Sequence, residues 1–232
     1  MSSLTPFNGT KIGSAPEALV RHIKDVGRPL TIRAGQMVVL HGARDRDIYY
    51  IERGSFEVAL TARDGQVIIV CDLGPGEIFG DLAAIVEGPR SASVVATDVG
   101  KIFAISESQF FEAVAPRSEL SFWFMRRLAH EITRLTEKVF ELAALSARNR
   151  LHCELHRLCV GLPVADGKVI VAKPPTHETI AMRIGSQRET VSREMSKLST
   201  QGIVQKQRQG LVVDLDRLSA QVAAELGRPL NV

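Results

Sequence analysis

One repeat constrains the fold of this chain more than any other feature. Between residues 117 and 145 no glycine or proline occurs, and the stretch predicts one helix on the order of 43 Å long. Apolar residues recur in it at alternating steps of three and four: Met125, Leu128, Ile132, Leu135, Val139 and Leu142. Their 3.5-residue period is typical of a coiled coil, so we expect a two-fold dimer interface along them. The alternative is packing within the chain's own domain. Arg127 and Glu131, four residues apart beside this seam, are predicted to pair.

Length and composition indicate an ordinary globular protein. The chain has 232 residues, enough for two domains, with 24% charged and 45% hydrophobic residues. A net charge of +3 is compatible with nucleic acid but does not require it. No apolar run is long enough to span a bilayer, and no signal-peptide pattern begins the chain, so no membrane partner is expected. Cys71, Cys153 and Cys159 lack paired spacing, which favours reduced thiols and a cytoplasmic location.

The order of predicted elements indicates an α+β chain. Residues 1–14 are expected to form a loose arm, and residues 15–27 a short helix. Short β-rich runs separated by turn glycines fill residues 28–106, which predicts an antiparallel barrel or jelly roll. After the long helix, Ser146 can cap a new helix over residues 147–160. Asp166-Gly167 and the stretch 203–214 predict two further hairpins.

The stretch from Gly76 to Val94 carries groups suited to an anionic ligand. Gly80 can open a helical turn whose amide groups point outward, and Arg90 follows ten residues later with Ser91. A carboxylate at Asp81 repels phosphate, but it suits a ligand that also carries a hydroxyl donor, as a ribose does. Phosphate together with hydroxyl indicates a nucleotide. The alternative is a surface arginine beside a helix-capping aspartate.

The stretch from Thr176 to Thr200 predicts two helices joined by a turn at Gly185. Ser186 and Glu189 have the spacing of a capping box at the start of the second helix. The second helix has an inward apolar stripe of Val191, Met195 and Leu198, and an outward face of Gln187, Arg188, Glu189, Ser192, Arg193 and Lys197. We interpret this face as reading DNA; the alternative is a charged, solvated helix.

The segment GEIFGDLAAIVEGPRSASV resembles the phosphate-binding cassette of cyclic-nucleotide-binding domains. A barrel, a long helix and a helix-turn-helix in that order resemble the CRP–FNR family of bacterial transcription regulators. The resemblance runs from about residue 15 to residue 214. It implies a β-roll nucleotide-binding domain over residues 1–115, a dimerisation helix over 116–145 and a winged helix-turn-helix domain over 146–232.

The resemblance also implies a ligand site for cAMP or cGMP as effector. Arg90 and Ser91 would hold the cyclic phosphate, and Gly80 would let the backbone approach it. Asp81 stands where the family's nucleotide binders usually have Glu on the ribose 2′-hydroxyl. Leu135-Thr136 stands where the family commonly has Thr-Ser, so only Thr136 carries over as a contact to the base. The implied ligand-binding set is Gly80, Asp81, Leu82, Arg90, Ser91, Ala92, Leu135 and Thr136.

For DNA, the resemblance implies a homodimer that reads a TGTGA-like palindrome with half-site centres about 34–36 Å apart. Arg188 and Arg193 would bind guanine, and Glu189 would accept from cytosine. The expected backbone contacts are Thr176, Ser186, Gln187, Ser192, Lys197, Lys206 and Arg208. RNA polymerase is an expected partner if the protein activates transcription. An alternative within the family is a nucleotide-independent member whose barrel is structural or senses another ligand.

Other chemistries have little support in the sequence. No Ser-His-Asp or phosphate-binding P-loop arrangement is present, so an enzyme is not expected. His152 and His156 have metal-binding spacing, but a zinc protease needs Glu directly after the first His, where Cys153 stands. The cysteine cluster of the family's iron–sulfur sensors is absent near the N-terminus, and nothing marks His41 as a haem ligand. No metal, haem or iron–sulfur cluster is therefore expected.

Overall fold

A computed structural model describes residues 14–226, so all but one residue of the expected N-terminal arm lie outside the described residues. The chain divides into two compact units, one ending at Ile132 and the other beginning at Thr133. This boundary falls inside the helix α4, Ser118–Ala144, instead of at its two ends. Each unit therefore includes part of the long helix. Among the described residues, no helix is long and apolar enough to cross a membrane.

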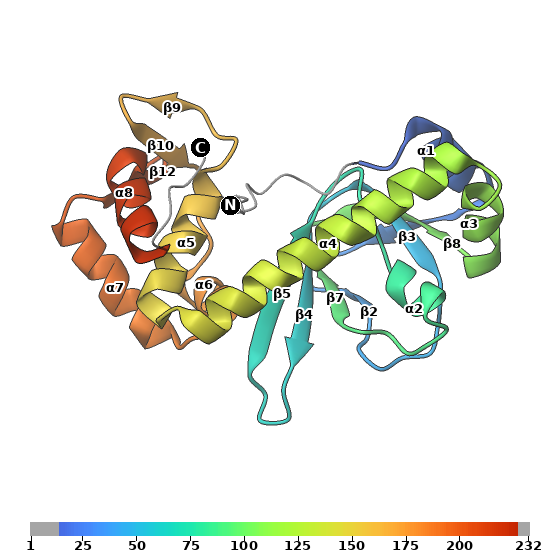
Figure 1. The fold of residues 1–232 in the computed structure, drawn as a ribbon, viewed down its shortest axis with the longest axis horizontal. Helices are drawn as coiled ribbons and strands as arrows, with labels where there is room; N and C mark the ends of the chain where they lie inside the picture. Colours follow the sequence, from blue (N-terminus) through green and yellow to red (C-terminus); the bar gives the residue numbers. More distant parts are fainter. Residues whose placement is uncertain (1–13, 227–232) are drawn as a thin grey trace, which may run out of the picture. The chain divides into compact units, whose positions relative to one another are not determined.

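The first unit is the expected antiparallel β-roll (Figure 1). Its strands form two four-stranded sheets, in the orders β1-β8-β3-β6 and β2-β7-β4-β5. The elements are α1 (Glu17–Val26), β1 (Arg28–Ile32), β2 (Met37–Val39), β3 (Ile48–Arg53), β4 (Phe56–Thr61), β5 (Val67–Leu73), β6 (Ile78–Phe79), α2 (Asp81–Ile85), β7 (Ser93–Ala96), β8 (Gly100–Ile105) and α3 (Glu107–Val114). All paired strands are antiparallel, which confirms the prediction from the β-rich runs and turn glycines.

The beginning of α4 belongs to the core of this unit. Leu120 and Phe124 are buried in one cluster with Leu19 of α1 and Phe110 of α3. The rings of Phe110 and Phe124 meet edge to face, with centroids 5.4 Å apart. These contacts fix the first turns of α4 to the β-roll, so a change in the β-roll can be transmitted to the helix.

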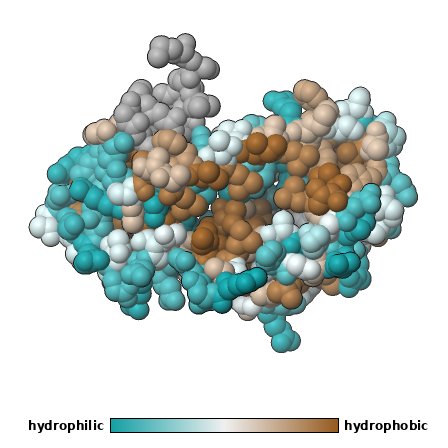
Figure 2. Space-filling view, turned by 60° about the horizontal axis from the view of Figure 1, so that its bottom comes forward, coloured by the Kyte–Doolittle hydropathy of each residue, from teal (hydrophilic) through white to brown (hydrophobic). Residues whose placement is uncertain are grey.

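The apolar seam of α4 is largely uncovered in the single chain. Met125 is 57% exposed, Ile132 66% and Val139 64%, and Leu135 and Leu142 are each 37% exposed. Leu128 alone of the six packs against the core of the first unit. Burial within the chain's own domain therefore explains Leu128 but not the other five. In the space-filling view, apolar residues gather on the face drawn in Figure 2 instead of being scattered singly.

The second unit has the order of a winged helix-turn-helix domain (Figure 1). Its elements after α4 are α5 (Ala147–Cys159), β9 (Val164–Ala165), β10 (Lys168–Val171), α6 (His177–Ile184), α7 (Arg188–Thr200), β11 (Val204–Gln207), β12 (Gly210–Asp214) and α8 (Leu215–Leu226). The strands form an antiparallel sheet in the order β11-β12-β10-β9. Ser146 caps α5 as predicted, and its hydroxyl accepts a hydrogen bond from the Asn149 amide at 3.2 Å.

The predicted capping box of the second helix-turn-helix helix is wrong. The residue at the N-cap of α7 is Gln187, and no side chain caps this helix. Ser186 is committed to the preceding helix, because its amide donates to the Ala181 carbonyl at 2.9 Å. Gly185 makes that closure possible with a left-handed backbone, φ 59°. The short turn thus uses Ser186 to end α6.

Candidate ligand cavity and recognition helix

Gly80 lies next to the guanidinium of Arg90, which is expected to bind phosphate. It precedes α2 with φ 87°, a conformation that side-chain-bearing residues rarely adopt. A Cβ atom there would lie 2.7 Å from Arg90 Nη1 and 2.7 Å from the Asp47 carbonyl oxygen. Both the left-handed backbone and the close neighbours therefore require glycine, and Gly80 precedes a helical turn as predicted.

A single cavity of about 90 Å³ brings together the predicted ligand residues of the first unit. Those lining residues are Gly80, Asp81, Leu82, Arg90, Ser91 and Ala92. Apolar side chains such as Val58 and Leu73 form much of the remaining wall, and α4 contributes Arg127, Leu128 and Glu131. The lining thus combines an apolar wall with a few charged groups, which is the usual composition of a small-molecule site.

Arg90 lines the cavity and is only 2% exposed. Its Nε donates to Asp45 Oδ2 at 3.1 Å, and its Nη2 also bonds that carboxylate. Nη1 donates to the Gly80 carbonyl at 2.9 Å, and Nη2 to the Asp47 carbonyl at 2.8 Å. The guanidinium is therefore held in place at the cavity and already has an anionic partner. Asp45, in the loop between β2 and β3, was not singled out by the sequence.

Asp81 is also buried and paired. It is 3% exposed and forms an ion pair with Arg127 of α4. Arg127 Nη2 donates in addition to the Ile78 carbonyl at 2.9 Å. The spacing rule for helices assigned Arg127 to Glu131, whereas its ion pair is with a residue of the cassette. This contact connects α2 directly with α4.

Leu135 and Thr136 lie beyond the boundary between the units, in the part of α4 that belongs to the second unit. Their predicted contacts with a ligand stay predictions. Leu135 is 37% exposed in the single chain, which is compatible with its expected place in the seam.

The face of α7 is arranged as predicted. Val191, Met195 and Leu198 are buried. The three residues expected to read bases, Arg188, Glu189 and Arg193, are exposed, as are Thr176, Gln187, Lys197, Lys206 and Arg208 of the expected backbone set. Ser186 and Ser192 are half-buried, and Ser192 Oγ lies 2.9 Å from His177 Nδ1 of α6.

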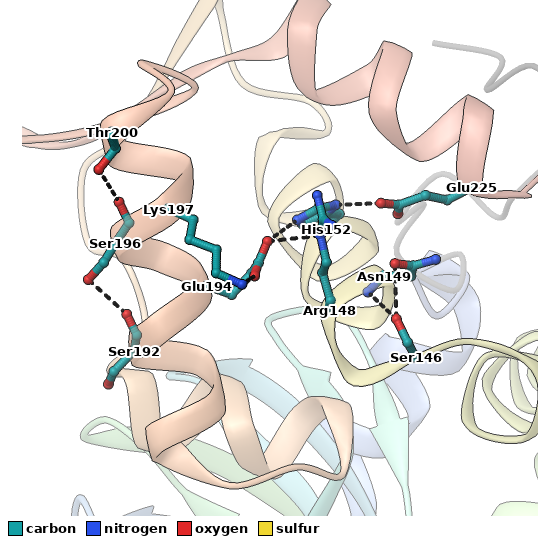
Figure 3. Close-up of polar contacts among 10 residues, drawn as sticks. All are labelled: Ser146, Arg148, Asn149, His152, Ser192, Glu194, Ser196, Lys197, Thr200 and Glu225. Atoms are coloured by element: carbon teal, nitrogen blue, oxygen red, sulfur yellow. Dashed lines mark hydrogen bonds and ion pairs between the residues drawn. The ribbon is translucent and has the colours of Figure 1, made fainter.

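A buried glutamate on this helix was not expected from its sequence pattern. Glu194 is 5% exposed and bonds Arg148 Nε at 3.0 Å, Lys197 Nζ at 3.2 Å and His152 Nε2 at 3.3 Å (Figure 3). Burial opposes ionisation, but the hydrogen bond from Lys197 and the charge of Arg148 hold the pKa of Glu194 below its usual value. Its position was signalled, because Glu194 lies three residues after Val191 and four before Leu198, on the inward face.

The cysteines and histidines of α5 are structural in character. Cys71, Cys153 and Cys159 are free thiols. Burial raises the pKa of Cys153 to about 12 and that of Cys159 to about 11, so neither is a reactive thiolate. His152 bonds the carboxylates of Glu225 and Glu194. Within residues 14–226, no three His, Cys, Asp or Glu side chains are grouped to hold a metal ion.

Comparisons with known proteins agree with both halves of this arrangement. Residues 29–116 match the model of the cyclic nucleotide-binding domain, and residues 126–221 match that of the Crp-like helix-turn-helix domain. The chain is 30% identical over 173 residues to the cyclic AMP receptor protein of Thermus thermophilus, covering 73% of this chain and 76% of that protein. It is 26% identical over 211 residues to the CRP-like cAMP-activated global transcriptional regulator of Mycobacterium tuberculosis, covering 89% and 93%.

Solved structures show the same fold. A variant of CooA from Carboxydothermus hydrogenoformans matches with a TM-score of 0.76 at 20% identity, over 90% of this chain and 96% of that one. The nucleotide-binding and helix-turn-helix domains, in this order and joined by the long helix, are therefore those of a transcription regulator and not of an enzyme. The chain belongs to the CRP–FNR family of transcription regulators.

Proposed function

We propose that the protein is a dimeric regulator whose DNA binding is gated by a cyclic purine nucleotide in the cavity of the first unit. The observation that carries the proposal is the convergence of Arg90, Ser91 and Asp81 on one cavity that α4 also lines. Arg90 and Ser91 would bind the cyclic phosphate, and Asp81 would accept from the ribose hydroxyl. cAMP is the first choice of effector, because relatives of this chain are cAMP-activated regulators.

The gating would use the ion pair between Asp81 and Arg127. A ribose hydroxyl that bonds Asp81 must share or replace the contact that Arg127 makes, and Arg127 stands on α4 beside the dimer seam. A ligand shifts an equilibrium only by its differential affinity for the two states, and this contact is a place where that difference can arise. The exposed seam of α4 would join two chains, so that two copies of α7 reach a palindromic, TGTGA-like site in the cytoplasm. RNA polymerase would be a partner if the regulator activates transcription.

Titration calorimetry with cAMP and with cGMP, each repeated with DNA present, tests this proposal. We expect micromolar-range binding of at least one nucleotide, and weak discrimination because Leu135 replaces a hydroxyl-bearing residue. A preference for one nucleotide over the other beyond about a thousandfold, equivalent to roughly 4 kcal/mol, would contradict the proposed contacts to the base.

A second candidate function is that of a nucleotide-independent regulator. Arg90 already has Asp45 as its anion, and the open cavity of about 90 Å³ is smaller than the ~300–1,000 Å³ of typical ligand pockets. In this case neither nucleotide would give heat in the titration, while the protein would bind its DNA site unaided.

A further inference from the structure

A buried histidine in the second unit lies between two carboxylates that come from different helices. The side chain of His152, on α5, is fully buried. Its Nδ1 lies 2.9 Å from Glu225 Oε1 of α8, and its Nε2 lies 3.3 Å from Glu194 Oε1 of α7 (Figure 3). One imidazole ring thus connects the recognition helix with both α5 and α8.

The two contacts of the ring limit how hydrogens can be arranged in this cluster. An ionised carboxylate only accepts hydrogen bonds, and a neutral imidazole has a single N–H. Two contacts to carboxylates therefore need two hydrogens, one more than a neutral ring supplies. Glu194 also has Arg148 and Lys197 as partners. For Glu225 the described contacts give only His152, and its Oε2 is buried without a hydrogen-bond partner in the described part of the chain. The doubly protonated ring satisfies both carboxylates.

The other charged groups around α5 are directed elsewhere or complete the cluster. From α5 itself Arg148 reaches Glu194, and from α7 Lys197 does so as well. Arg183 of α6 reaches Glu154, on another part of α5. His156 follows one turn after His152 and is not placed between carboxylates; burial and the nearby Arg157 charge lower its pKa. Of the two histidines of α5, His152 is thus the one that lies against a side chain of α7, while His177 of α6 contacts α7 separately through Ser192.

We propose that His152 is a positioning residue for DNA reading. Its imidazolium holds α7 through Glu194 and α8 through Glu225, an arrangement of three residues that we call the clamp. Loss of the second proton loosens α7 and weakens DNA binding. Glu194 directly follows Arg193, so a shift at Glu194 moves a side chain expected to read bases. The inference rests on the proposed reading of DNA by α7, and it adds a proton-dependent support behind that helix.

The affinity for DNA as a function of pH tests the proposal with the full-length protein. The probe is the duplex recovered by selection from a random pool, measured by fluorescence anisotropy at fixed ionic strength. Over about pH 5 to 8, where histidine side chains change charge, we expect the parent's affinity to fall as pH rises. The fall should be about tenfold, within the range of couplings between distinct sites.

Two substitutions separate the two contacts of the ring. His152→Gln places an amide donor where Nε2 stands, so it should keep the contact to Glu194 without titrating and give a flatter pH profile. His152→Asn places its donor on the side of Glu225, so it should bind DNA about tenfold more weakly at the acid end. His156→Gln, a buried histidine on the same helix, is the matched control and should keep the parent's profile.

The outcomes are distinct. A bound duplex whose affinity follows the same pH profile in the parent, His152→Gln and His152→Asn overturns the clamp and leaves DNA reading intact. Recovery of no duplex overturns both. If the variants do not fold, as circular dichroism would show, ¹⁵N NMR of the DNA-bound parent decides: two protonated ring nitrogens at the acid end support the clamp, and a single N–H overturns it.

Discussion

The cavity of the first unit and the recognition helix of the second hold their charged groups in opposite ways. In the cavity, Arg90 and Asp81 are almost fully buried, and each already has an ion partner within the chain. On α7, Arg188 and Arg193 are exposed, and the buried charge is Glu194 behind them.

This difference suits two kinds of binding. A ligand that bound Arg90 and Asp81 as proposed would compete with Asp45 and Arg127, so its binding would be coupled to the β2–β3 loop and to α4. A buried charge stays favourable only while it has a partner, so these exchanges are cooperative. Exposed side chains on a well-supported helix can meet DNA with little rearrangement of the protein. The two arrangements agree with the proposed roles, which are gating for the first region and DNA reading for the second.

The largest expected effect comes from separating the two chains of the proposed dimer. Ile132 and Val139 are 66% and 64% exposed, and burying each is worth about 1.5–3 kcal/mol per chain. Substituting both by Asp should make the protein monomeric in sedimentation. DNA affinity should then fall by about a hundredfold or more, because a monomer binds through one α7 and a dimer binds through two linked copies. Nucleotide affinity should change far less.

Thr133→Asp is the control for this experiment. It adds one negative charge, half of what the double substitution adds, at an exposed position of α4 next to the seam residue Ile132 but outside the apolar repeat. The control should remain dimeric. A dimer that survives the double substitution would show that the seam lies elsewhere.

Next in size is the loss of Arg90. Arg90→Ala removes the charge-assisted contact to phosphate, which should weaken nucleotide binding by about 2–3 kcal/mol in calorimetry. Arg33→Ala, an exposed arginine of the same unit, should bind as the parent does. Because Asp45 and two carbonyl groups lose their partner as well, thermal unfolding should be measured alongside. Equal affinity in Arg90→Ala and the parent would contradict the phosphate assignment.

The sequence predicted contacts between residues that are close along the chain, and it did not predict contacts between residues that are far apart along it. The seam of α4, the hairpins and the grouping of Gly80 with Arg90 follow from local spacing and turn chemistry, and the structure has the helix, the hairpins and one cavity. The partners of the two cavity charges are 45 and 46 residues away along the chain, and only the tertiary fold brings them together. No spacing rule could assign Asp45 to Arg90 or Arg127 to Asp81.

The remaining differences have local causes. The predicted capping box does not form because Ser186 ends α6 instead of beginning α7. The left-handed backbone of Gly185 lets the amide of Ser186 donate to the Ala181 carbonyl of α6. Glu194 lay on the inward stripe of α7, and a buried charge at such a position needs partners from other helices. The two ligand residues beyond the unit boundary, Leu135 and Thr136, stay predictions.

A smaller effect is expected at a single base contact. Arg193→Ala should cost about 1–3 kcal/mol on the selected palindrome and relax the preference for one guanine. Lys206→Ala, on the wing strand β11, should weaken binding evenly across sequences and reduce the salt slope by about one. Nucleotide affinity should be unchanged in both, as the comparison between the two regions requires. Selection of unpaired sites, or of palindromes without the guanines, would contradict the dimer and the readout together.

The smallest expected effect is also the most direct probe of the cavity. Asp45 bonds Arg90 as a bound phosphate would. Its side chain is 49% exposed, so breaking this ion pair should require little free energy. Asp45→Asn keeps the shape and removes the charge that a cyclic phosphate has to replace. Nucleotide affinity should therefore rise by about 1 kcal/mol, roughly fivefold. Asp47→Asn is the matched control, because Asp47 contacts Arg90 through its backbone carbonyl, so this substitution should leave affinity unchanged.

A fall in affinity in Asp45→Asn would mean that Asp45 orients the guanidinium for the ligand instead of competing with it. The buried charges of the cavity would then be preorganised, and the contrast with α7 would rest on burial alone.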